Sequence, residues 1–155
     1  MSSWNRDCAL ACLCLLPLCV QGATPMVVAG RRSAVALKSD GTVLTWGRDD
    51  SGNLGSGRAL DQTTLAQVPG LNLGSGITQT MVSASMQVLL ADSQGRVWAW
   101  GDNSSGQLGD ATATTRTNPA LVKGITGVRA VSAARSFSVF LKSDGTVWST
   151  VSPTG

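Results

Sequence analysis

The chain has 155 residues, no histidine and a formal net charge of +3. This length suffices for one modest hydrophobic core, and the charge is too small to indicate a nucleic-acid partner. All four cysteines lie within the first 20 residues, and the rest of the chain lacks His, Cys, Tyr and Glu. These absences exclude a histidine general base, a cysteine nucleophile and a His/Cys zinc site. We therefore predict a protein that is not an enzyme, with no catalytic residues, no cofactor and no metal.

The N-terminus contains an apolar run from Ala9 to Val20. Twelve residues are too few to span a bilayer but match the core of a secretory signal, and small residues place cleavage after Gly22. We predict that residues 1–22 are a signal peptide, that the mature protein is secreted or periplasmic, and that no membrane span follows. Two alternatives stay open: a lipid-modified Cys19, or a true start at Met26, which would leave the protein cytoplasmic.

A hairpin motif then recurs three times, at 36–43, 90–97 and 140–147. The turn glycines Gly41, Gly95 and Gly145 are 54 and 50 residues apart. Asp-Gly and Gln-Gly pairs at these turns supply the positive φ that a tight hairpin needs. Self-similarity at a fixed period is the signature of a repeat architecture.

Each period contains four short apolar segments and no helical pattern. In the first period we expect strands at 27–29, 34–37 and 42–46 and a fourth near 65–69, with the second period's fourth strand near 120–123. Four strands per period of about 50 residues predict an all-β protein built from propeller blades of four-stranded antiparallel sheets. The repeats run from 26 to 150, as 26–76, 77–125 and a partial 126–150, followed by a tail at 151–155.

Three ordered blocks recur in register: the Asp-Gly hairpin, then Trp-Gly, then Ser-Gly-Gln/Asn-Leu-Gly. Together they resemble the regulator-of-chromosome-condensation (RCC) repeat family over about 26–148. The resemblance implies blades of a seven-bladed β-propeller, a scaffold for binding proteins. The positions that carry this structural motif are Asp40, Gly41, Trp46, Gly47, Gly52, Leu54, Gly55, Gly95, Trp98, Trp100, Gly101, Gly106, Leu108, Gly109, Asp144, Gly145 and Trp148.

The chain departs from the family pattern in three ways. In many members of the family, one position of each repeat is histidine; in the three repeats of this chain it is Ser33, Gln87 and Phe137. In the third repeat, Thr150-Val151 stands where Trp-Gly is expected. A ring of seven such blades needs roughly 350 residues. We therefore expect an incomplete ring: a fragment or frameshifted copy of a larger propeller, a mispredicted reading frame, a chain that self-associates to close a ring, or a small open fold.

Two groups of side chains could carry other functions. Asp49, Asp50, Asp102 and Asp110 flank the glycine-rich loops and could bind calcium, but they lack EF-hand spacing, which favours loop capping. The repeated tryptophans could stack on a sugar, although their strand positions favour packing between blades.

The leading functional hypothesis is a non-enzymatic scaffold whose blade loops bind a protein partner that the sequence does not identify. One alternative, implied by the family resemblance, is a guanine-nucleotide exchange factor for a small GTPase. The missing blades, the absent histidines and the predicted signal count against it. The other alternative is a carbohydrate-binding propeller that uses the tryptophans.

Overall fold

The computed structural model describes residues 25–73, 77–82 and 86–150, and all regular structure in these ranges is β-strand. The predicted signal peptide, its cleavage site at Gly22 and the tail at 151–155 lie outside the described residues. The strands form three antiparallel sheets, which we call blades 1, 2 and 3. Blade 1 contains β1 (Met26–Ala29), β2 (Ser33–Leu37), β3 (Thr42–Gly47) and β4 (Gln62–Asn72). Blade 2 contains β5 (Ile77–Val82), β6 (Gln87–Asp92), β7 (Val97–Gly101) and β8 (Arg116–Leu121), and blade 3 contains β9 (Val128–Ala133), β10 (Ser138–Lys142) and β11 (Val147–Ser149).

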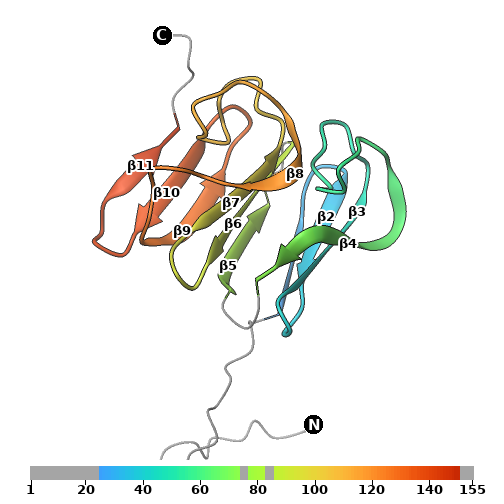
Figure 1. The fold of residues 1–155 in the computed structure, drawn as a ribbon, viewed down its shortest axis with the longest axis horizontal. Helices are drawn as coiled ribbons and strands as arrows, with labels where there is room; N and C mark the ends of the chain where they lie inside the picture. The colour runs from blue at the N-terminus through green and yellow to red at the C-terminus, as the bar shows by residue number, and fades with distance from the viewer. Residues whose placement is uncertain (1–24, 74–76, 83–85, 151–155) are drawn as a thin grey trace, which may run out of the picture.

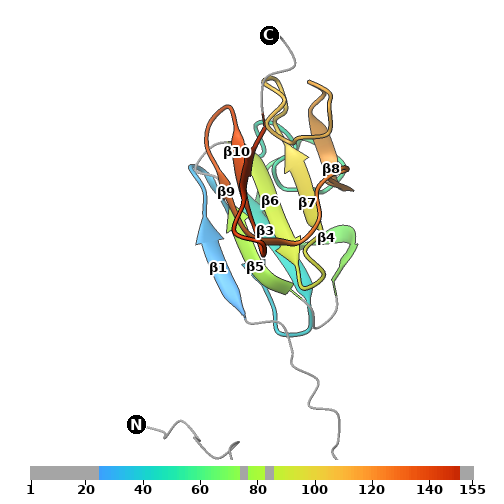
Figure 2. The same ribbon diagram turned by 90° about the vertical axis from the view of Figure 1, so that its left-hand side faces the viewer.

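The three blades stand side by side in chain order (Figure 1). Each blade is a meander in which every strand pairs with the next one along the chain. The first strands of the blades lie next to one another, because β5 contacts β1 on one side and β9 on the other. Seen from the side, the sheets overlap as stacked layers (Figure 2). The arrangement confirms the predicted all-β propeller blades, and the described blades do not close into a ring.

The hairpin turns are fixed by carboxylates that bind backbone N–H groups. Asp40 accepts a hydrogen bond from the N–H of Thr42 at 2.9 Å, and Asp144 does the same for Thr146 at 2.9 Å. The second turn has Gln94 at this position, and Asp92 accepts from the N–H groups of Gln94 and Arg96 instead, at 3.0 and 2.9 Å. Short polar side chains that bond the backbone two residues on are typical of such turns.

Strand β6 of blade 2 is buried on both faces, which explains its sequence. Every residue of β6 is buried, whereas β2 and β10 alternate between buried and partly exposed positions. The residues of β6 divide by face: Val88 and Leu90 join a core with blade 1, and Leu89 and Ala91 join a core with blade 3. A strand covered on both sides reads as a continuous apolar run, as residues 88–91 do between the polar ends Gln87 and Asp92.

The predicted fourth strands were wrong in extent. In blade 1 the strand is longer than the expected 65–69, since it spans Gln62–Asn72, and in blade 2 it lies earlier than 120–123, at Arg116–Leu121. Both pair with the preceding strand through an irregular register, with shifts between Thr45 and Gly47 and between Ala99 and Gly101. Bulges and polar edge positions remove the period-two pattern on which strand prediction depends.

Candidate interaction surface

The meander places two kinds of connection at opposite ends of the blades. The hairpins at 38–41, 92–95 and 142–145 form one end, the turn end. The other end, which we call the loop end, is formed by 30–32, 48–61, 102–115 and 134–137, and its two long loops project together (Figure 1). Loops held by a rigid scaffold are the usual place for recognition, so the loop end is the candidate interaction surface.

The two long loops share one buried backbone. Gly55 donates to the carbonyl of Gly52 at 3.0 Å, and Gly109 donates to that of Gly106 at 3.0 Å. Leu54 and Leu108 are buried at the equivalent positions. The predicted motif residues thus form the same turn in both repeats. The exposed residues of the two loops, by contrast, differ in sequence.

In the loop of blade 2, Asn103 holds the two sides together. Its carbonyl oxygen accepts from the N–H of Leu108 at 2.9 Å, and its amide donates to the carboxylate of Asp110 at 3.0 Å. Asp110 also forms an ion pair with Arg116. Burial alone would raise the pKa of Asp110, but hydrogen bonds from Thr112 and Arg116 outweigh it and lower the pKa to about 2.

In the loop of blade 1, Asp49 takes the place of Asn103. The residue is 6% exposed, and neither carboxylate oxygen has a hydrogen bond of standard geometry to another described residue. Burial raises the pKa of this carboxyl above its usual value, although nearby N–H groups, led by that of Leu54, oppose the shift. Of the other two aspartates considered for calcium, Asp50 pairs with Arg48, and Asp102 accepts from the N–H of Ser104 at 3.0 Å. Among the described residues, no group of three or more His, Cys, Asp or Glu side chains is arranged to hold a metal ion.

Each long loop also contacts the next blade. The indole Nε1 of Trp100 donates to the carbonyl of Asn53 at 3.0 Å. A Cβ on Gly55 would lie 2.9 Å from the same nitrogen, so the ring leaves room only for glycine. At the next junction, Ser138 donates its hydroxyl to the carbonyl of Gln107 at 2.6 Å. These contacts bind each loop to the following blade and fix its position.

The remaining motif tryptophans are less buried than Trp100. Trp98 is partly buried and packs against the core between blades 1 and 2, and Trp46 is also partly buried. Trp148 is 53% exposed, and Lys142 Nζ lies 5.6 Å from the centre of its ring. The tryptophans thus do not form one shared stacking surface.

The loop end exposes apolar and positively charged side chains. Leu60 is 59% exposed and Phe137 is 46% exposed. Arg31, Arg58 and Arg135 are exposed and form no ion pair with any residue in the described part of the chain. Nothing in the amino-acid sequence distinguishes Leu60, Arg58 or Arg135, because isolated apolar or charged residues are common in polar loops.

At the turn end, two lysines lie beside carboxylates of the hairpin turns. Lys38 pairs with Asp40 at 2.8 Å, and Lys142 pairs with Asp144 at 3.2 Å. Hydrogen bonds from Lys38 and Thr42 hold the pKa of Asp40 well below its usual value. Those from Thr146 and Lys142 lower the pKa of Asp144 to about 2. These two turn-end lysines are therefore paired, whereas exposed Arg129, beside hairpin 92–95, forms no ion pair within the described residues.

Comparison with known proteins identifies the repeats. The family model of the regulator of chromosome condensation (RCC1) repeat matches residues 94–141, and a second model of the same repeat matches residues 27–53. The chain belongs to the RCC1 repeat family. The human E3 ubiquitin-protein ligase HERC2 is 36% identical over 124 residues, which are 79% of this chain and 2% of the ligase. The ultraviolet-B receptor UVR8 of Arabidopsis thaliana is 32% identical over 67% of this chain and 23% of the receptor.

Solved RCC1-like structures share the fold. Human WBSCR16 superimposes with a TM-score of 0.69 and 20% identity, over 82% of this chain and 33% of that one. Prp20p from Saccharomyces cerevisiae gives a TM-score of 0.67 and 18% identity, over 83% of this chain and 32% of that one. The chain thus covers about a third or less of the length of each of these relatives and solved structures. Within the described ranges, no helix is long and apolar enough to cross a membrane.

Proposed function

We propose that the protein is a non-enzymatic binding module whose loop end recognises a protein partner. The observation that carries the proposal is the contrast within the two long loops. Positions that build the loop backbone are buried and nearly identical in both, whereas exposed positions differ: Asp50 corresponds to Ser104, and Leu60 to Thr114. A constant scaffold with variable exposed side chains suits recognition of a specific partner.

Two similar solved structures favour a protein, and not another kind of molecule, as the binding partner. One similar chain comes from the crystal structure of Kap60 bound to yeast RCC1 (Prp20), with a TM-score of 0.66 and 23% identity over 28% of that chain. The Prp20p structure is reported together with its binding properties to Gsp1p and histones. Identities this low carry the fold alone, so these partners are not transferred to the present chain. The unpaired arginines beside Leu60 and Phe137 favour a partner surface that is acidic with apolar contacts.

The proposal is tested by comparing two charge reversals of the same kind. Arg58→Glu changes the loop end, and Arg129→Glu changes an exposed residue of β9 away from it. Proteins from the native source are cross-linked to each variant and to the unaltered chain, and the bound species are counted by mass spectrometry. We expect a partner that Arg58→Glu loses and Arg129→Glu retains. A partner that both variants retain, or that both lose, contradicts recognition by the loop end.

We further propose that the chain is exported, and this rests on the apolar run 9–20 alone. Fusion of residues 1–25 to a reporter that is active only outside the cytoplasm tests it. Activity with cleavage after Gly22 supports export. An inactive, uncleaved fusion would favour a start at Met26 and a cytoplasmic protein.

Self-association or additional blades would complete the binding surface. Val27 and Val147, on the first and last described strands, are 67% and 66% exposed, which supports further β-structure covering these outer blades. Light scattering on the purified chain distinguishes a self-assembled ring from a monomer that needs blades of a longer polypeptide.

The two alternative functions have less support. The first alternative was a guanine-nucleotide exchange factor. The similarity to Prp20p is limited to the fold and covers about a third of that chain, so we do not propose this activity. A sugar platform would need several accessible rings, but of the described tryptophans Trp148 alone is largely exposed, and Trp100 is buried at the junction of blades 1 and 2.

A further inference from the structure

The two junctions between blades are built alike, except for one side chain. Trp100 contacts Gly55 at the first junction, and Thr150 contacts Gly109 at the second. A Cβ on either glycine would lie 2.9 Å from its neighbour, which is Trp100 Nε1 in one case and Thr150 Cγ2 in the other. Thr150 therefore occupies the position of Trp100, but its side chain ends where the indole ring would continue.

At the second junction, another side chain supplies the hydrogen bond that an indole would donate, but no side chain fills the volume of the indole ring. The carbonyl of Gln107 corresponds to that of Asn53, and it accepts from Ser138 at 2.6 Å rather than from a tryptophan. In blade 2 the residue equivalent to Ser138 is Val88, which has no donor. The second junction thus lacks only the apolar bulk of a ring.

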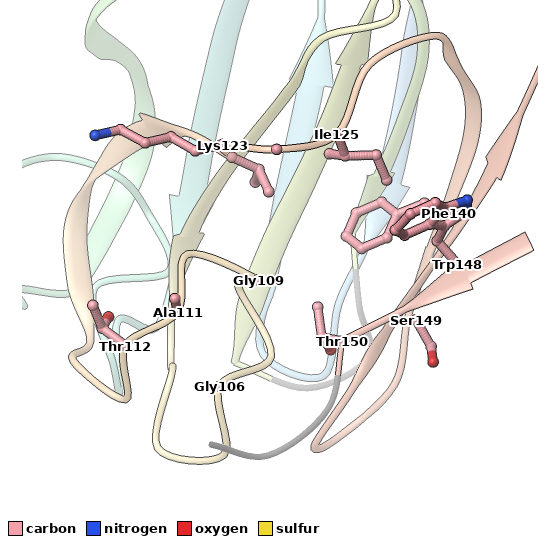
Figure 3. A pocket seen from close by; sticks show the side chains of 12 residues that line it. Gly106, Gly109, Ala111, Thr112, Lys123, Ile125, Phe140, Trp148, Ser149 and Thr150 are labelled. Atoms are coloured by element: carbon pink, nitrogen blue, oxygen red, sulfur yellow. The ribbon is translucent and has the colours of Figure 1, made fainter.

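A pocket of about 300 Å³ lies at this place. Phe140 and Trp148 form one side of it, and the loop through Gly106 and Gly109 lies opposite, with Ile125 pointing toward the aromatic rings (Figure 3). Lys123 also borders the pocket, but its side chain extends away from these rings (Figure 3). The interior is therefore mostly apolar, with an aromatic side.

We propose that this pocket binds a small planar aromatic molecule of the size of indole. The ring of the ligand would take the place that the ring of Trp100 takes at the first junction. A dry apolar cavity of about 150 Å³ accepts benzene in another protein, so a pocket of this volume has room for a bicyclic ring. Phe140 and Trp148 offer the edge-to-face or offset contacts that aromatic pairs prefer. Because Ser138 already satisfies the carbonyl, the ligand needs no N–H donor.

The proposal is tested by titrating the full chain with indole and following binding by calorimetry. We expect saturable binding at one site per chain, with no competition from imidazole, which is smaller and polar. Thr150→Trp supplies the missing ring from within the protein and should weaken indole binding by about tenfold or more. The control Val147→Trp adds the same side chain three residues earlier, on β11, at an exposed position outside the pocket lining, and should bind indole as the unaltered chain does.

A second variant covers the case in which Thr150→Trp does not fold. Trp148→Ser removes one aromatic side of the pocket at a position that is already 53% exposed, so the fold should tolerate it. We expect it to weaken indole binding severalfold. Absence of indole binding to the unaltered chain would overturn the proposal. So would binding that Trp148→Ser leaves unchanged, or that Val147→Trp weakens as much as Thr150→Trp does.

Discussion

The indole nitrogen of Trp100 donates a hydrogen bond to the backbone carbonyl of Asn53, 3.0 Å away and 47 positions earlier in the chain. The ring is fully buried between blades 1 and 2 and belongs to their shared core. One side chain thus joins a loop of the first repeat to the third strand of the second. The Trp-Gly motif connects neighbouring repeats as well as shaping its own.

Replacing Trp100 should separate the first two blades. Trp100→Ala is expected to lower the free energy of unfolding by about 3–5 kcal/mol, because a large buried ring is lost and the Asn53 carbonyl loses its donor. Trp46 holds the equivalent position in blade 1 but is only partly buried, so Trp46→Ala should cost about 1–2 kcal/mol. Chemical denaturation measures both values. Equal losses would show that the tryptophans act within their own blades.

Two turn glycines offer a matched pair for testing contacts between repeats. Gly95 and Gly145 have φ values of 72° and 85°, so valine is strained at both. A Cβ on Gly95 would also lie 2.7 Å from Cα of Gly127, at the start of the next blade, whereas one on Gly145 would meet nothing within 4 Å. We expect Gly95→Val to cost about 3 kcal/mol or more and Gly145→Val about 1–2 kcal/mol. Thermal unfolding of both variants measures the difference, and similar melting temperatures would argue against close packing at Gly127.

Much of the fold could be predicted from the sequence because its signals are local. Asp-Gly or Gln-Gly between two apolar runs favours a hairpin, and three such turns in register indicate a repeat. The fourth strands were harder to place. Residues Gln62 to Thr64 are polar, and this strand is held by pairing with β3 through a shifted register, which only the assembled sheet determines.

The buried carboxyl of Asp49 should destabilise the protein at neutral pH. Its equivalent, Asn103, donates from its amide to loop carbonyls, including that of Thr112 at 3.0 Å. Asp49→Asn restores such a donor and removes a buried charge, so we expect about 1 kcal/mol of added stability at pH 7.

The pH dependence of that gain follows from the raised pKa of Asp49. The folded protein binds this proton more tightly than the unfolded chain does, so ionisation at neutral pH costs stability. The advantage of Asp49→Asn should therefore shrink as the pH falls from 7 toward 4. Urea titrations of both proteins at the two pH values measure it. The reverse change, Asn103→Asp, should destabilise blade 2, and a neutral result there would contradict the account.

Asp110 should contribute stability with the opposite pH dependence. Its pKa of about 2 in the folded protein lies below its ordinary value of 3.8. The ionised form is thus favoured by folding, and its contribution is full above about pH 4 and lost as the pH falls through about 2. Asp110→Asn should remove up to about 2 kcal/mol at pH 7 and flatten the acid limb of the stability curve. An unchanged acid limb would mean that the hydrogen bonds of this carboxylate with Thr112 and Arg116 contribute nothing to stability.

The candidate site was less predictable than the fold. The sequence showed that Thr150 stands where tryptophan is expected, but not that a pocket results, because Phe140, Ile125 and Trp148 meet there only after two blades pack. Likewise, the sequence does not distinguish Leu60 and Phe137 from other apolar loop residues. Only the folded structure shows that both are exposed at the loop end.

The exchange of donors between the two junctions can be measured by a double-mutant cycle. Ser138 is buried and its hydroxyl binds the Gln107 carbonyl, so Ser138→Ala should cost about 1–2 kcal/mol by leaving that carbonyl without a donor. Thr150→Trp provides an indole N–H at the position from which Trp100 serves Asn53. In its presence Ser138→Ala should cost little, since the carbonyl again has a donor. The cycle should give a coupling energy of about 1 kcal/mol, measured by denaturation of the four proteins. Additive losses would mean that a tryptophan at this junction does not reach the Gln107 carbonyl, and that the two junctions are not built alike.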